Sequence, residues 1–132
     1  MKKDKLISII DDDVIYKYAI KIQFQEVGVM SNIVDFDNGE DALHYMTQNL
    51  SKTSKLPDYI FLDINMPIMD GFEFMEEFIK LQPNIGKPIT VYMVSSSVNN
   101  VDIERAKAIS QISDYIIKPM SVDHLKTFLN KL

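Results

Sequence analysis

The chain has 132 residues, of which 46% are hydrophobic and 25% are charged, the composition of one globular domain and not of a disordered or membrane-spanning protein. The formal net charge of −5, with no basic block beyond the first few residues, argues against direct nucleic-acid binding, because phosphate contacts need a concentrated basic surface. The absence of cysteine excludes disulfides, thiolate metal sites and a thiol nucleophile. We therefore expect a single cytoplasmic domain over residues 1–132, with no signal peptide and no membrane insertion.

Five short apolar runs, each followed by polar or turn-forming residues, predict strands. They lie at residues 6–10, 31–36, 59–62, 89–94 and 114–117. The segments between them carry apolar residues at helical spacing and predict helices over residues 14–27, 40–49, 72–81, 99–110 and from 122 to the end. Strands that alternate with helices predict an α/β fold, in which a parallel sheet is covered by helices on both faces.

The apolar faces of two of these helices can be assigned from their spacing. In the first helix, apolar residues at helical spacing are Ile15, Tyr18, Ala19 and Ile22, and a wider stripe adds Ile20, Phe24 and Val27. In the last helix, the residues expected to face inward are Val122, Leu125, Leu129 and Leu132. Both helices are therefore predicted to pack on the sheet.

Polar residues follow four of the five predicted strands. Parallel strands all end at the same edge of the sheet, so these residues gather there although they are far apart in the sequence. They are Asp11, Asp12 and Asp13 after the first strand, Asp63 after the third, Ser95 after the fourth and Lys118 after the fifth. An aspartate in the position of Asp63 can also be a helix cap, and Asp13 is expected to begin the next helix. The other members of the set favour a functional site at this edge.

This set of groups suits phosphoryl transfer to a carboxylate. Clustered carboxylates repel one another unless a hard cation is present, and an all-oxygen site favours Mg²⁺. Zinc is disfavoured because there is no cysteine and because His44 and His124 lie on predicted helices. A carboxylate beside the cation can attack phosphorus to give an acyl phosphate. The cation and the Lys118 ammonium would neutralise the developing charge, and Ser95 can donate a hydrogen bond to a phosphoryl oxygen.

Four motifs occur in order over the whole chain. They are residues 9–13 (IIDDD), 61–67 (FLDINMP) with 69–71 (MDG), 93–95 (MVS) and 115–119 (YIIKP). Their combination resembles the receiver domains of two-component response regulators and is similar to the stand-alone chemotaxis type. The resemblance implies a flavodoxin-like (βα)5 fold with a doubly wound five-stranded parallel sheet in the order 2-1-3-4-5.

The resemblance also implies roles for the residues at the sheet edge. Asp63 would accept the phosphoryl group and Lys118 would contact it. Asp12 would bind Mg²⁺ directly, Asp11 would act largely through water, and the backbone carbonyl of Asn65 would complete the protein ligands.

A switch is implied as well. Ser95 would be the switch hydroxyl, and Tyr115 the aromatic side chain whose rotamer follows it, although the sequence is equally consistent with Tyr115 as plain core. By the resemblance, the output surface would be the fourth helix, the fifth strand and the fifth helix.

The expected function is therefore that of a single-domain response regulator with no attached effector domain. A histidine kinase or phosphotransfer protein would phosphorylate Asp63, and the domain would be no enzyme beyond self-phosphorylation from a phosphodonor and slow autodephosphorylation. A phosphorelay intermediate, a phosphate sink and a phosphorylation-independent docking module are alternatives. A phosphatase with an aspartyl-phosphate intermediate is disfavoured, because Asn65 stands where such enzymes usually have a second aspartate.

Overall fold

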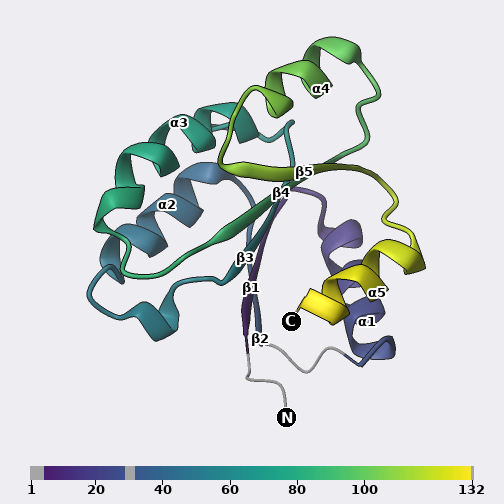
Figure 1. Ribbon diagram of the computed structural model, residues 1–132, viewed down its shortest axis with the longest axis horizontal. Coiled ribbons are helices and arrows are strands. Elements are labelled where there is room, and N and C mark those ends of the chain that lie inside the picture. Colours follow the sequence, from purple (N-terminus) through teal and green to yellow (C-terminus); the bar gives the residue numbers. More distant parts are fainter. Residues whose placement is uncertain (1–4, 29–31, 132) are drawn as a thin grey trace.

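A parallel sheet of five strands forms the centre of the molecule (Figure 1). The computed structural model describes residues 5–28 and 32–131, with side chains up to residue 127. The strands are β1 (Leu6–Ile10), β2 (Asn32–Phe36), β3 (Tyr59–Leu62), β4 (Thr90–Ser95) and β5 (Ile112–Ile117). Their order is β2-β1-β3-β4-β5, and every neighbouring pair is parallel. The predicted fold class and strand order are confirmed.

Helices cover both faces of the sheet. They are α1 (Val14–Glu26), α2 (Gly39–Gln48), α3 (Gly71–Leu81), α4 (Asn100–Lys107) and α5 (Val122–Lys131), with short 3₁₀ turns η1 (Thr53–Lys55) and η2 (Gln82–Asn84). Figure 1 shows α1 and α5 on one side of the sheet and α2 and α3 on the other. No helix of the described ranges is long and apolar enough to cross a membrane.

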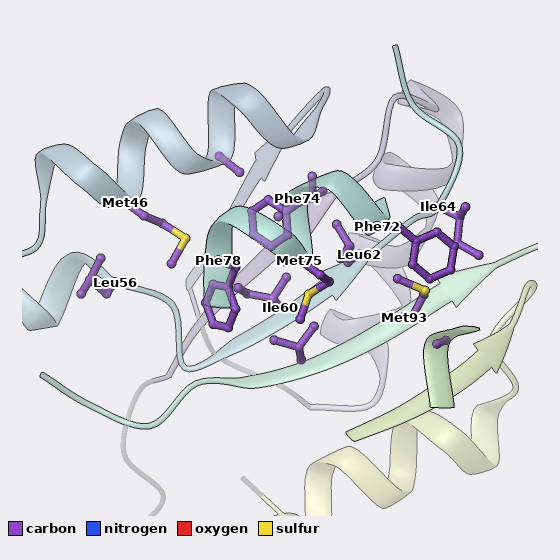
Figure 2. Close-up of a cluster of buried hydrophobic side chains, with 14 residues drawn as sticks. Met46, Leu56, Ile60, Leu62, Ile64, Phe72, Phe74, Met75, Phe78 and Met93 are labelled. Carbon is purple, nitrogen blue, oxygen red and sulfur yellow. The ribbon is translucent and has the colours of Figure 1, made fainter. Parts of the chain in front are cut away.

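The two faces of the sheet have separate hydrophobic cores, because neighbouring residues of a strand point to opposite faces. The core under α2 and α3 contains three buried phenylalanines of α3 packed on strand residues (Figure 2). Labelled members are Ile60, Leu62, Phe72, Phe74, Phe78 and Met93. The core on the other face contains Ile7, Ile9, Ile20, Phe24, Phe61 and Tyr92. Burial on both faces explains why the strands read as continuous apolar runs.

The strand register aligns the carboxyl ends of β1 and β3. Ile10 of β1 pairs with Leu62 of β3, so Asp11 and Asp63 each follow one member of the same pair. The Asp63 N–H donates to the carbonyl of Ile10 at 3.0 Å, and the Asp11 N–H donates to the carbonyl of Phe36 at 3.0 Å. Both aspartates therefore begin their loops from backbone held by the sheet.

The orientation of α1 differs from the prediction. Ile15 and Tyr18 are 80% and 69% exposed, whereas Ile20 and Phe24 are buried. The narrower set of apolar residues was therefore the wrong face, and the wider stripe contains the buried one. Apolar residues occur all around this helix, so spacing alone could not select a side. Lys17 lies on the buried side and reaches Asp37 in an ion pair.

The last helix is predicted correctly in part. Leu125 is buried, but Val122 is 54% exposed, because it is the first residue of α5 and lies beyond the edge of the core. The side chains of Leu129 and Leu132, and Ser31 of the predicted second strand, lie outside the described part of the chain.

The loop between β3 and α3 depends on Gly71. Its N–H donates to the carbonyl of Ile64 at 2.8 Å, and a Cβ at this position would lie 2.3 Å from the carbonyl oxygen of Asp63. Only glycine permits this approach. Asp70 and Glu73 then form a capping box that begins α3.

The same loop contains a strained residue, Ile68. Its φ is +69°, and the N–H of Met69 donates to the carbonyl of Pro67 at 2.7 Å, which closes a three-residue turn around Ile68. The left-handed region costs about 1–2 kcal/mol for residues other than glycine, and β-branched residues rarely adopt it.

Replacing Ile68 with asparagine is therefore expected to raise the free energy of unfolding by about 1 kcal/mol, because asparagine tolerates this conformation. The side chain of Ile68 is 73% exposed, so little packing is lost. Urea denaturation measures the change. Val98→Asn is the matched control, because Val98 is 69% exposed without a positive φ, and it should change stability by less than about 0.5 kcal/mol. A loss of stability in Ile68→Asn would contradict the strain.

Candidate functional site

Three carboxylates converge at the carboxyl edge of the sheet. One ligand oxygen from each of Asp11, Asp12 and Asp63 lies within 4.8 Å of the others. Asp11 and Asp63 are 2% and 8% exposed, and Asp12 is exposed. The predicted convergence of residues from two strands is therefore present, with one carboxylate open to solvent and two sheltered.

Lys118 reaches the same cluster from the end of β5. Its Nζ lies 2.5 Å from Oδ2 of Asp11 and 3.6 Å from Oδ1 of Asp63. The backbone N–H of Lys118 donates to the carbonyl of Ser95 at 2.9 Å, so β4 fixes where the lysine leaves the sheet. The ammonium is thus placed between two buried carboxylates, as the strand-end reasoning predicted.

The pKa of Asp63 is raised from 3.8 to about 6. Burial of the carboxyl is the largest cause, followed by the negative charge of Asp11. The Lys118 ammonium and the N–H of Ile64 lower the pKa, but they do not offset the first two causes. Asp63 therefore lies in a position where a negative charge is costly unless a further cation is present.

The donor set fits Mg²⁺. The cluster supplies carboxylate oxygens from three residues, and hard oxygen ligands with room for water are what this ion requires. Asn65 lies two residues beyond Asp63 on the β3–α3 loop and is exposed. In the described chain, Asp11, Asp12 and Asp63 are the residues that would hold the ion, and one coordination side is open to solvent through Asp12.

Ser95 and Tyr115 lie on neighbouring strands and meet at the loop that follows β4. Ser95 is fully buried, and its Oγ accepts a hydrogen bond from the N–H of Ser97 at 3.2 Å. The hydroxyl of Tyr115 donates to the carbonyl of Ser97 at 2.8 Å. Ser97 in turn donates through Oγ to Asp102 of α4 at 2.7 Å. The two predicted switch residues are thus connected through one loop residue.

Some predictions about neighbouring residues are also confirmed. Asp13 caps α1 by accepting a hydrogen bond from the N–H of Tyr16 at 3.0 Å. His44 and His124 are exposed on α2 and α5, away from the strand ends.

Sequence reasoning missed Tyr16 and Asp102. The Tyr16 ring lies against the Lys118 ammonium, with Nζ 4.3 Å from the ring centroid. The available signal was the place of Tyr16 in the first turn after the acidic run, near the same sheet edge. Asp102 lies in the first turn of α4 and has no distinguishing sequence pattern.

The fold and this site define a signalling module with a carboxylate cluster at its centre. The model of the response regulator receiver domain matches residues 7–130, and the chain belongs to that family. It is thus the receiver domain of a two-component response regulator.

Relatives with known structures or names agree with this assignment. A two-component response regulator from Cytophaga hutchinsonii is 27% identical, with a TM-score of 0.86 over 98% of this chain and 97% of that one. The phosphorylated cyanobacterial phytochrome response regulator RcpA is also 27% identical, with a TM-score of 0.77 over 98% of this chain and 91% of that one.

Among curated proteins, the match to "Probable methanogenesis regulatory protein FilR2" of Methanothrix harundinacea is 26% identical over 96% of this chain and 80% of that protein. The match to the sensor histidine kinase CheAY of Helicobacter pylori is 30% identical over 97% of this chain but covers only 15% of the kinase. The chain thus corresponds to most of the first relative and to a small part of the second.

Proposed function

We propose that this receiver domain is a Mg²⁺-dependent phosphorylation switch in which Asp63 accepts a phosphoryl group from a histidine kinase or a phosphotransfer protein. The observation that carries the proposal is the buried Asp63 carboxylate beside Asp11, Asp12 and Lys118. A structural carboxylate has no need of two further acids, whereas a nucleophile toward phosphorus needs a cation and an ammonium close by.

In the proposed reaction, a carboxylate oxygen of Asp63 attacks the phosphorus of the donor. The new bond is O–P, and the bond that breaks is P–N of a phosphohistidine or P–O of an acyl phosphate. The bound metal supplies positive charge to the phosphoryl oxygens. Lys118, 3.6 Å from Asp63 before reaction, supplies a second positive charge.

The response to phosphorylation would begin at Ser95. Its hydroxyl is oriented toward the loop by the Ser97 N–H, and a new negative charge on Asp63 would compete for it. Movement of this loop would change the carbonyl of Ser97 that Tyr115 contacts and so release the ring. A charge at one site would thus bias a two-state element on the α4-β5-α5 surface, which we propose binds the downstream target.

Incubation with acetyl phosphate and Mg²⁺, followed by intact mass measurement, tests the proposal. The wild type is expected to gain one phosphoryl group, and Asp63→Asn none. Asp123→Asn is the control, because Asp123 is an exposed carboxylate on α5, and it should react like the wild type. An equal adduct on Asp63→Asn, or no adduct on the wild type, would disprove the role of Asp63.

Output, relay and sink roles share this chemistry and differ only in the acceptor of the signal. The docking alternative is distinguished by partner binding: if Asp63→Asn binds every partner as the phosphorylated wild type does, phosphorylation is not the switch. Steady turnover of small phosphate esters would instead indicate a phosphatase.

A further inference from the structure

The Lys118 ammonium has a third neighbour besides Asp11 and Asp63, which is the ring of Tyr16. The distance from Nζ to the ring centroid is 4.3 Å, inside the range in which the negative face of an aromatic ring attracts a cation. The Lys118 side chain is only 15% exposed, so water screens this attraction less than it would on the surface.

The position of the Tyr16 ring is fixed by its surroundings. Its backbone N–H donates to the capping side chain of Asp13 at 3.0 Å, which places the residue in the first turn of α1. The side chain packs against the core cluster that contains Ile20 and Phe24. The ring is therefore held from both the helix end and the core.

The hydroxyl of Tyr16 does not explain this placement. Its oxygen is buried and has no hydrogen-bond partner among the described residues. Burial, and then the charges of Asp11 and Asp63, raise the pKa of the phenol, so it stays neutral. An unpartnered buried hydroxyl costs free energy, which leaves the ring face as the favourable contact that Tyr16 makes at the site.

We propose that Tyr16 is a positioning residue whose ring face holds the Lys118 ammonium against Asp11 and Asp63, where an incoming phosphoryl group meets it. The contact with Lys118 exists in the unmodified protein. Its consequence for phosphoryl binding rests on the proposed function of Asp63.

The contact can be tested without any phosphodonor by NMR of the metal-free protein. The ring current of an aromatic face shifts nearby protons upfield, so the ε-methylene protons of Lys118 should be shifted in the wild type. Tyr16→Phe keeps the ring and should keep the shift, whereas Tyr16→Leu should lose it. Equal Lys118 shifts in Tyr16→Leu and the wild type would overturn the proposal.

The consequence can be tested with beryllofluoride and Mg²⁺, which together mimic the phosphoryl group on Asp63. Tyr16→Leu is expected to bind beryllofluoride about three- to tenfold more weakly, and Tyr16→Phe within about twofold of the wild type. If Tyr16→Phe loses as much affinity as Tyr16→Leu, the hydroxyl acts instead of the ring, and the proposal is wrong.

A double-mutant cycle separates positioning from a general effect on folding. In the Lys118→Met background, Tyr16→Leu should no longer weaken beryllofluoride binding, because the cation that the ring holds is gone. An undiminished effect in that background would show that Tyr16 acts through packing alone. Should the wild type fail to gain a phosphoryl group or to bind beryllofluoride, the function of Asp63 is disproved, while the NMR comparison still decides the contact.

Discussion

Replacing Lys118 with methionine is expected to lower the free energy of unfolding of the metal-free protein by about 2–4 kcal/mol above roughly pH 7. Lys118 is the cation that lies against both Asp11 and Asp63, and the side chains of these carboxylates are 3% and 10% exposed. Methionine has a similar length without the charge, so the two carboxylates would be left facing each other. Removing one partner of a buried ion pair costs more than the pair contributes in net terms.

Urea denaturation with and without Mg²⁺ measures this effect. The ion should restore more stability to Lys118→Met than to the wild type, because it replaces the missing positive charge. Lys126→Met is the matched control, since Lys126 is exposed on α5, and its stability should change by less than about 0.5 kcal/mol. Equal losses in the two variants would show that Lys118 does not balance the acidic cluster.

The residues of this cluster could be predicted because the fold multiplies weak signals. Asp11, Asp63 and Lys118 are each unremarkable in isolation, but all three follow apolar runs typical of buried strands. A parallel sheet sends every strand end to one edge, so recognising the strands was enough to bring the three together. The confirmed strand order places β1 and β3 side by side, as the pairing of Ile10 with Leu62 shows.

The orientation of α1 could not be predicted in the same way. Its buried side is determined by contacts between distant residues, such as the ion pair from Lys17 to Asp37, and not by the apolar pattern. The contact of Tyr16 with Lys118 depends on that orientation, since a helix turned the other way would leave Tyr16 away from the site. The same holds for the link from Tyr115 through Ser97 to α4, which depends on the course of an irregular loop.

The converse change, Asp63→Asn, is expected to raise the free energy of unfolding of the metal-free protein. The folded protein holds the pKa of Asp63 at about 6, against 3.8 for the ordinary carboxyl. Each pKa unit corresponds to about 1.4 kcal/mol, so ionisation of Asp63 costs the fold about 1–3 kcal/mol above pH 6. Asparagine has nearly the same shape and no charge, and it removes this cost.

The pH dependence identifies the cause. Below about pH 4, Asp63 is protonated in both the folded and the unfolded chain, and the variant should be no more stable than the wild type. Between about pH 4 and pH 6 the folded chain binds more protons at this residue, so wild-type stability falls relative to the variant as pH rises. Denaturation series across this range, with Glu76→Gln as an exposed control on α3, measure the difference.

Magnesium should act in the opposite direction on the two proteins. An ion that binds the folded wild type stabilises it by about 1.4 kcal/mol at ten times its dissociation constant, whereas Asp63→Asn lacks one of the three ligand carboxylates and should respond less. The stability gap between the proteins would then narrow as Mg²⁺ is added. A gap that is independent of both pH and Mg²⁺ would mean that Asp63 is not the residue whose charge the site is built to compensate. A gap that closes with both would place the cost of that charge at the atom proposed to attack phosphorus.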